Sequence, residues 1–162
     1  MPIVEVRKNP EALTLTVVAQ FAAPVARVWA AYADPRQLER FWGPPEWPAT
    51  FVRHDFVVGG RSEYYMSGPN GEKSSGYFEY LVVDAPNAFE VQDGFLGADG
   101  APVPGMPTMR IRFTFEPHDG GTRMVTLTTF PSAEALEQLL QMGMEEGMRS
   151  AMSQIDDVLA ES

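Results

Sequence analysis

Hydrophobic and polar residues alternate along the stretch ALTLTVVAQF. Leu13, Leu15, Val17, Ala19 and Phe21 occupy one phase of this alternation. A period of two is typical of a strand with one buried face. The pattern therefore predicts a β-strand whose side chains in this phase face a core.

Helical spacing follows at once in APVARVWAAYADP, where apolar residues recur every three or four positions. Asp34-Pro35 ends this pattern, because the residue before a proline is disfavoured in a helix. RQLERFW predicts a short second helix, and FWGPPEWPA then predicts a loop, since its prolines exclude a helix and a central strand.

Residues 50 to 130 show a pattern that is typical of strands separated by turns. Six apolar or alternating runs are separated by glycine- and proline-rich breaks, and they are TFVRHDFVV, RSEYYM, SGYFEYLVV, AFEVQDGF, TMRIRFTF and RMVTLTTF. With the first strand this makes about seven, joined by links short enough for antiparallel pairing.

The C-terminal segment predicts one long helix. Ser132 is a good N-cap, Glu134 suits the helix dipole, and no proline follows. A helix of about 28 residues would be about 40 Å long. Its apolar stripe includes four residues at helical spacing, Leu136, Leu140, Met144 and Met148.

This order of elements predicts an α+β fold in a single domain over residues 1–162, with a curved antiparallel sheet of about seven strands and two short helices after the first. One long C-terminal helix must cover the apolar face of the sheet. A curved sheet can grip that helix only if space is left beneath it, so we expect a cavity.

The amino-acid composition argues against some classes of binding partner. The chain has 22 acidic and 12 basic residues and a formal net charge of −10, which argues against nucleic acid and anionic membrane surfaces. It has no cysteine, no apolar signal-peptide core and no run of 18 apolar residues. We expect a cytoplasmic protein.

Several stretches resemble a known family: FAAPVARVWAAYADPRQLERFWGP, HDFVVGGRSEYYMSGPNGE, GYFEYLVVDAP and MEEGMRSAMSQIDDVL. They look like the Hsp90-ATPase-activator-homologue (AHSA1) branch of the START/Bet v 1-like superfamily, also called the SRPBCC or polyketide cyclase and dehydrase-like group. The similarity spans roughly residues 10 to 160. It implies the helix-grip fold, in which the sheet wraps the C-terminal helix around a hydrophobic ligand cavity. One departure is that Met148 follows Gly147 where many relatives have a tryptophan.

Members of this superfamily include lipid carriers, cyclases and co-chaperone domains, so the fold does not choose among functions. We expect binding of a small hydrophobic molecule, because apolar residues are many and catalytic ones few. Two alternatives stay open: a cyclase- or hydratase-like enzyme with His54 as base and Tyr64 or Tyr80 as donor, and an Hsp90-type ATPase-activating co-chaperone domain. A homodimer also stays open.

The sequence offers few residues that are candidates for catalysis or for binding a metal or cofactor. Alternation in TFVRHDFVV places Val52, His54, Phe56 and Val58 on the more apolar face, so His54 points inward, while His118 lies in a solvated turn. The sequence has neither a usual metal-ligand set nor a phosphate or dinucleotide loop, so we expect no metal and no cofactor.

Aromatic and methionine side chains supply the predicted ligand site. Two tryptophans of the proline-rich loop could close the mouth of a cavity or plug the core, and the methionines of the last helix suit either a pocket or core filling. No residue is assigned a catalytic role. The predicted ligand-binding residues are Trp42, Trp47, His54, Phe56, Tyr64, Met66, Phe78, Tyr80, Phe113, Met144 and Met148.

Overall fold

The structure is a computed structural model and describes residues 3–160. Eight strands form one sheet, and helices follow the second and the last strand. The elements are β1 (Ile3–Asn9), β2 (Thr14–Phe21), α1 (Val25–Ala33), α2 (Pro35–Trp42), β3 (Ala49–His54), β4 (Arg61–Ser67), β5 (Lys73–Asp84), β6 (Ala88–Leu96), β7 (Met109–His118), β8 (Gly121–Thr129), α3 (Ala133–Gln141), α4 (Met144–Met152) and α5 (Ile155–Leu159).

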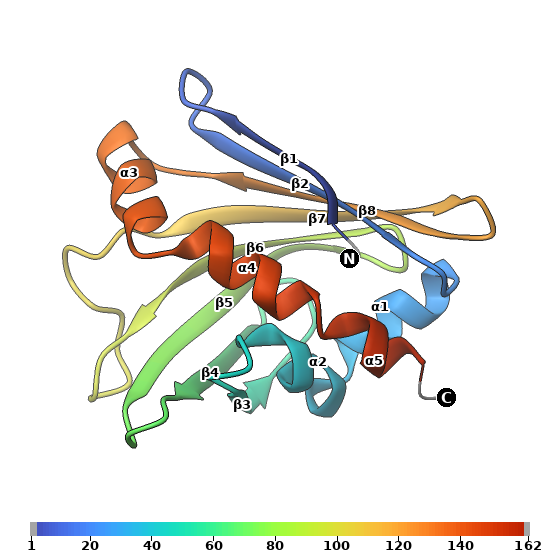
Figure 1. The fold of residues 1–162 in the computed structure, drawn as a ribbon. Coiled ribbons are helices and arrows are strands. Elements are labelled where there is room, and N and C mark those ends of the chain that lie inside the picture. Colours follow the sequence, from blue (N-terminus) through green and yellow to red (C-terminus); the bar gives the residue numbers. More distant parts are fainter. Residues whose placement is uncertain (1–2, 161–162) are drawn as a thin grey trace.

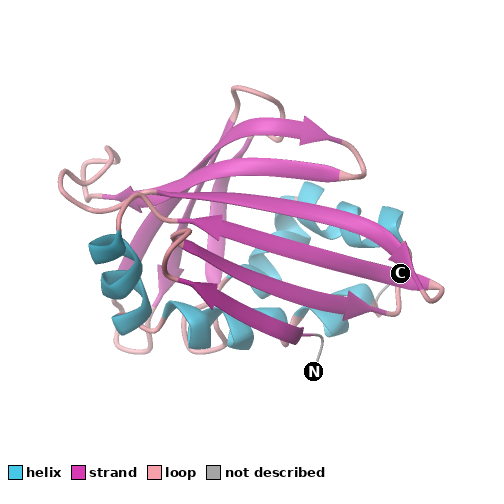
Figure 2. Cartoon of the chain, turned by 90° about the horizontal axis from the view of Figure 1, so that it is seen from above, coloured by secondary structure: helices cyan, strands magenta, loops and turns pink. Residues whose placement is uncertain are grey.

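All neighbouring strands pair antiparallel, in the order β1-β2-β8-β7-β6-β5-β4-β3. The helices lie on one side of this curved sheet, and α4 and α5 run across its inner face (Figures 1 and 2). The predicted α+β helix-grip architecture is confirmed. No helix within residues 3–160 is both long enough and apolar enough to cross a membrane.

The inner face of the sheet follows the predicted alternation. Leu15, Val17, Ala19 and Phe21 of β2 are all buried in the core. On β8 the same face carries threonines as well as Met124, so the inner surface is not purely apolar.

The sheet has eight strands, one more than the seven segments identified in the sequence. The additional strand is β1, which pairs with β2 at the edge of the sheet. Edge strands bury little surface, and here Val4 is exposed while Ile3 and Val6 are only half-buried. The apolar alternation is therefore too weak to mark β1 in the sequence.

The predicted single C-terminal helix is also wrong, because it is divided into α3, α4 and α5. Ser132 caps α3 as expected, its hydroxyl accepting a hydrogen bond from the Ala135 N–H at 3.0 Å. Gly143 has a φ of +87° and breaks the helix after Met142. A left-handed residue cannot continue a right-handed helix, and glycine adopts this conformation without the steric penalty of a Cβ.

A β-bulge changes the faces expected for β3. The register between β3 and β4 shifts between Phe51 and Arg53. Phe51 is consequently buried, whereas Val52 is 66% exposed, opposite to the predicted phase. His54 still points inward because the extra residue restores its phase after the bulge.

Candidate functional site

A cavity of about 320 Å³ lies between the inner face of the sheet, the end of α2 and the C-terminal helices. Its wall combines aromatic rings, aliphatic side chains and methionines with very few polar groups. The lining residues are Tyr32, Phe41, Trp42, Pro44, Tyr64, Met66, Asp93, Phe95, Met109, Ile111, Phe113, Thr126, Leu139, Met142, Gly143, Met144, Gly147, Met148, Ala151 and Met152.

The cavity reaches the surface at the break between α3 and α4. Met142 lines it and is 58% exposed, and the adjoining Gly143 is exposed as well. The helix break that the sequence did not predict thus forms part of the mouth.

The proline-rich loop after α2 is fastened to the C-terminal helices. The Gln154 side-chain amide donates a hydrogen bond to the Gly43 carbonyl at 2.7 Å. Pro44 lies against α4, where a Cβ built on Gly147 would meet the Pro44 ring at 4.0 Å. The loop therefore closes one side of the cavity.

Trp42, which ends α2, and Trp47 of the loop have different environments. Trp42 lies on the cavity wall, with its ring 4.7 Å from Phe78 between centroids. Trp47 is half-buried and covers Gly68, where a Cβ would lie 2.7 Å from the indole. Trp42 can contact a ligand directly, whereas Trp47 packs outside the cavity.

Asp93 of β6 is the acidic group of the wall, and it is only 8% exposed. Burial raises its pKa to about 7. Hydrogen bonds from the Gly94 N–H and from the Tyr64 side chain act in the opposite direction and lower the pKa. Tyr64 in turn bonds to the side chain of Trp42, and burial raises the Tyr64 pKa well above its ordinary value. Three elements, α2, β4 and β6, thus meet in one hydrogen-bonded group.

Gly76 makes room for this group. It pairs with Tyr64 across β4 and β5, and a Cβ at this position would lie 2.5 Å from the Tyr64 hydroxyl oxygen. The absence of a side chain at Gly76 therefore lets the phenol lie flat over β5 and reach Asp93.

Thr126 of β8 is a second polar residue on the cavity wall. It is 1% exposed, lines the cavity, and its hydroxyl has no hydrogen-bond partner among the described residues. Thr126 pairs with Phe113 and Asp93 pairs with Met109, so the two polar residues lie two strands and four positions apart. One small polar group does not contact both.

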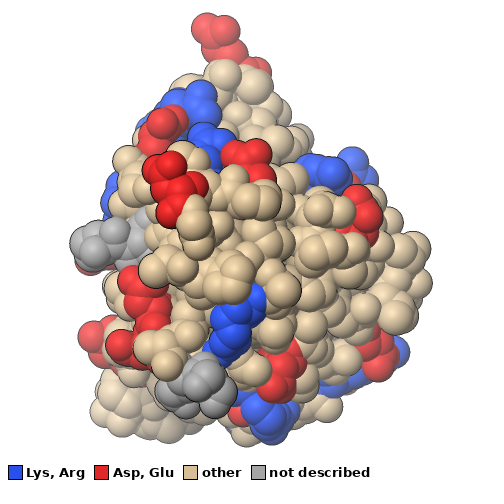
Figure 3. Space-filling model, turned by 90° about the vertical axis from the view of Figure 1, so that its right-hand side faces the viewer, with Lys and Arg blue, Asp and Glu red and all other residues tan. Residues whose placement is uncertain are grey.

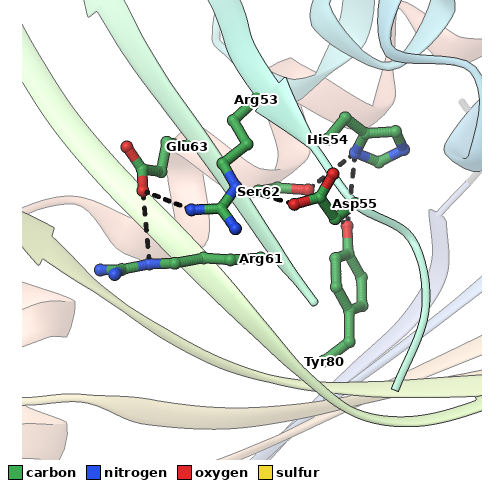
Figure 4. Close-up of polar contacts among 7 residues, drawn as sticks. All are labelled: Arg53, His54, Asp55, Arg61, Ser62, Glu63 and Tyr80. Atoms are coloured by element: carbon green, nitrogen blue, oxygen red, sulfur yellow. Dashed lines mark hydrogen bonds and ion pairs between the residues drawn. The ribbon is translucent and has the colours of Figure 1, made fainter. Parts of the chain in front are cut away.

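His54 lies next to the hydroxyl groups of Ser62 and Tyr80 (Figure 4), and it does not line the cavity. Its Nε2 lies 3.1 Å from the Ala33 carbonyl, which can only accept, so Nε2 carries the proton. Burial lowers the His54 pKa, and the neutral ring accepts at Nδ1 from the Ser62 hydroxyl at 2.7 Å. Ser62 accepts from the Tyr80 hydroxyl at 2.7 Å. Both ring nitrogens are therefore occupied in a contact that joins α1 to the sheet.

Arg53, Arg61 and Glu63 form a separate surface group beside this network (Figure 4). Glu63 lies 3.6 Å from each of the two guanidinium groups, and Arg53 also pairs with Asp55 at 2.8 Å. Such partly exposed pairs contribute at most about 1 kcal/mol each.

Six of the eleven residues predicted to bind a ligand line the cavity: Trp42, Tyr64, Met66, Phe113, Met144 and Met148. Five do not, namely Trp47, His54, Phe56, Phe78 and Tyr80. Phe56 packs between Trp29, at 5.3 Å, and Tyr80, at 5.0 Å, and Phe78 lies behind Trp42. Aromatic rings fill the space under α1 and leave the cavity at the α3–α4 end.

The sequence reading missed Asp93. In AFEVQDGF this residue falls in the same phase as Phe89 and Val91, so it is a carboxylate on an apolar strand face. That mismatch is the signal that could have identified it.

On the face shown in Figure 3, acidic and basic side chains are interspersed among uncharged areas. Within residues 3–160 no group of three or more histidine, aspartate or glutamate side chains is placed to hold a metal ion.

Comparison with known proteins agrees with this architecture. The family model described as Activator of Hsp90 ATPase homolog 1-like protein matches residues 22–160. No curated protein matches the chain.

Solved structures of similar proteins extend over almost the whole chain. A crystal structure from Mycobacterium smegmatis is 50% identical, covers 99% of both chains and has a TM-score of 0.91. A solution structure from Arthrobacter aurescens is 49% identical over 98% of this chain and 92% of that one, with a TM-score of 0.93. Another from Staphylococcus epidermidis is 30% identical over 98% and 94%, with a TM-score of 0.85. The chain therefore belongs to the Activator of Hsp90 ATPase homolog 1-like family of the START/Bet v 1-like superfamily.

Proposed function

We propose that this protein binds a small, mainly apolar molecule in the cavity between the sheet and α4. The observation that supports this proposal is an apolar cavity of about 320 Å³ that reaches the surface. Ligand pockets commonly measure about 300 to 1,000 Å³ and are lined by hydrophobic side chains with a few polar groups. This cavity falls at the small end of that range.

The methionines suit such a role. Met66, Met109, Met144, Met148 and Met152 contribute flexible thioethers to the wall. Unbranched, polarisable side chains adapt to differently shaped ligands at low cost. The site thus favours shape tolerance over a single rigid fit.

The test uses N-phenyl-1-naphthylamine, a neutral apolar dye whose fluorescence rises in apolar surroundings. Dye binding to the purified protein should be saturable and should raise the stability, by about 2.7 kcal/mol at one hundred times the dissociation constant. Gly147→Phe should abolish binding because the ring would enter the cavity next to Pro44. Gly147→Ala is the matched control, since one methyl group leaves most of the cavity free.

Unsaturable dye binding, or equal binding by the Phe variant, would contradict the proposal. The co-chaperone alternative predicts a different result, because contact through the surface would not depend on the cavity. Stimulation of a chaperone ATPase that survives Gly147→Phe would favour that alternative.

The enzymatic alternative is not favoured by the position of its proposed base. His54 does not line the cavity, and its two nitrogens already bond to Ala33 and Ser62. The Tyr80 hydroxyl lies 3.4 Å from Nδ1 but belongs to the same enclosed network. A general base must reach the proton that it removes from a substrate.

A further inference from the structure

The charge of the cavity wall is one-sided. Asp93 is the single carboxylic acid among the described lining residues, and none of these residues is a lysine, arginine or histidine. A buried carboxylate normally has a cationic partner, because leaving it unpaired is costly. Here the protein supplies hydrogen bonds but no counter-charge.

The hydrogen bonds around Asp93 have a fixed direction. An indole N–H can only donate, so the Tyr64 oxygen accepts from Trp42. The Tyr64 hydroxyl proton is then free to donate to Asp93, and the Gly94 N–H donates to the same carboxylate. The two contacts made by Asp93 itself, with Gly94 and Tyr64, both place it as an acceptor. A carboxylate has about four lone-pair sites, so these two donors leave acceptor capacity for a ligand.

We propose, on the basis of the proposed function, that the cavity selects ligands carrying a protonated amine, with the ammonium group bonded to Asp93 and an apolar body against the aromatic and methionine wall. The ammonium would supply the missing counter-charge and donate to the remaining acceptor sites. The faces of nearby aromatic rings such as Trp42 also attract a cation.

The same arrangement disfavours anions such as fatty acids. A ligand carboxylate near Asp93 would place two like charges in an apolar site, and no lining residue could neutralise either. An anionic head placed at the Thr126 end would have a hydroxyl but no cation to bind.

Few ionisable groups lie close enough to Asp93 to affect its titration. Its strand neighbours are Phe78 on β5 and Met109 on β7, neither of which is ionisable, and Tyr64 faces it from β4. Tyr32 of α1 also lines the cavity, and burial raises its pKa far above neutrality. The charged side chains of α4, Glu145, Glu146 and Arg149, are not part of the wall.

The experiment compares three compounds that share one apolar body: 2-naphthylmethylamine, 2-naphthalenemethanol and 2-naphthoate. Each is titrated against protein loaded with N-phenyl-1-naphthylamine, and its affinity is obtained from displacement of the dye. At about pH 8, where Asp93 is ionised, the amine should bind at least about tenfold more tightly than the alcohol, and naphthoate should bind most weakly.

Asp93→Asn should remove this preference by lowering amine affinity about tenfold or more while leaving alcohol affinity within about twofold. Asp84→Asn, an exposed position at the end of β5, is the matched control for the change in net charge. In the unmodified protein the amine-to-alcohol preference should fall as the pH is lowered to about 6, because Asp93 becomes protonated.

Three results would overturn the inference: equal displacement by amine and alcohol, strongest displacement by naphthoate, or an amine preference that survives Asp93→Asn. The neutral dye separates these results from failure of the proposed function. Dye that binds in the cavity without any amine preference refutes the inference alone, whereas dye that does not bind refutes the proposed function. If Asp93→Asn does not fold, a pH-independent preference in the unmodified protein would be equally decisive against the inference.

Discussion

Asp93 should make the ligand-free protein less stable at neutral pH than in mild acid. Its pKa is about 7 in the folded protein, against 3.8 for the unperturbed side chain. The folded state therefore holds a proton that the unfolded state has already lost between these values. The stabilisation is fully present below about pH 4 and is lost as the pH rises to about 7. Three pKa units correspond to roughly 4 kcal/mol, a large share of the 5 to 15 kcal/mol typical of a domain.

The perturbation that isolates this effect is Asp93→Asn. The amide cannot ionise but keeps an oxygen that can accept from Tyr64. The free energy of unfolding is measured by urea denaturation from about pH 4 to about pH 8, without ligand, for both proteins. The free energy of unfolding of the variant, relative to that of the unmodified protein, should rise by up to about 1.4 kcal/mol per pH unit. This rise should continue up to about pH 7, and the difference should be constant above that pH.

Subtracting the free energies of unfolding of the two proteins cancels the contributions of other titrating groups. Burial lowers the His54 pKa, which destabilises the folded state as the pH falls and so acts in the opposite direction, but it does so in both proteins. Asp84→Asn again controls for the change in net charge. A difference for Asp93→Asn that stays constant within about 0.5 kcal/mol across this range would refute the reasoning.

Three further predictions concern glycines, the histidine network and the tryptophan loop. Gly147→Ala should stabilise the protein by up to about 1 kcal/mol in urea unfolding, whereas Gly143→Ala, at φ +87°, should destabilise it by about 1 to 2 kcal/mol; changes of the same sign would contradict this. His54→Ala should cost about 2 kcal/mol through its lost hydrogen bonds while leaving dye affinity unchanged, and weaker dye binding would place His54 in the site. Trp47→Ala should cost less than the roughly 3 to 5 kcal/mol of a core tryptophan and leave dye affinity unchanged, whereas Trp42→Ala should alter it; the reverse result would make Trp47 the ligand contact.

The sequence predicted those parts of the fold that depend on local patterns. The alternation in β2 and the N-cap at Ser132 act over a few residues, and both are present in the structure. β1 was not predicted because an edge strand needs little apolar character. The helix break at Gly143 was missed because glycine inside an apolar stripe is compatible with a continuous helix at a cost of about 1 kcal/mol.

The site was only partly predictable for a different reason. Periodicity assigns a side chain to a face but not to a cavity, and inward-facing Phe78 and Tyr80 fill the core while inward-facing Tyr64 and Phe113 line the cavity. That division depends on how rings from α1, α2 and the strands β3 to β7 pack together. The bulge after Phe51 similarly depends on pairing with β4, which no local pattern of β3 reports.

The two inferences about the cavity have a common physical basis. An apolar residue in place of Asp93 would remove an unpaired acid from the cavity wall, so the carboxylate is not explained by stability alone. Trp42, Tyr64 and Gly94 nevertheless bond around it, and Gly76 leaves space for the tyrosine to do so. A group that destabilises the empty protein but is held in place by four residues is most simply understood as a binding group. Its energetic cost is recovered when a ligand supplies a further donor and the missing charge.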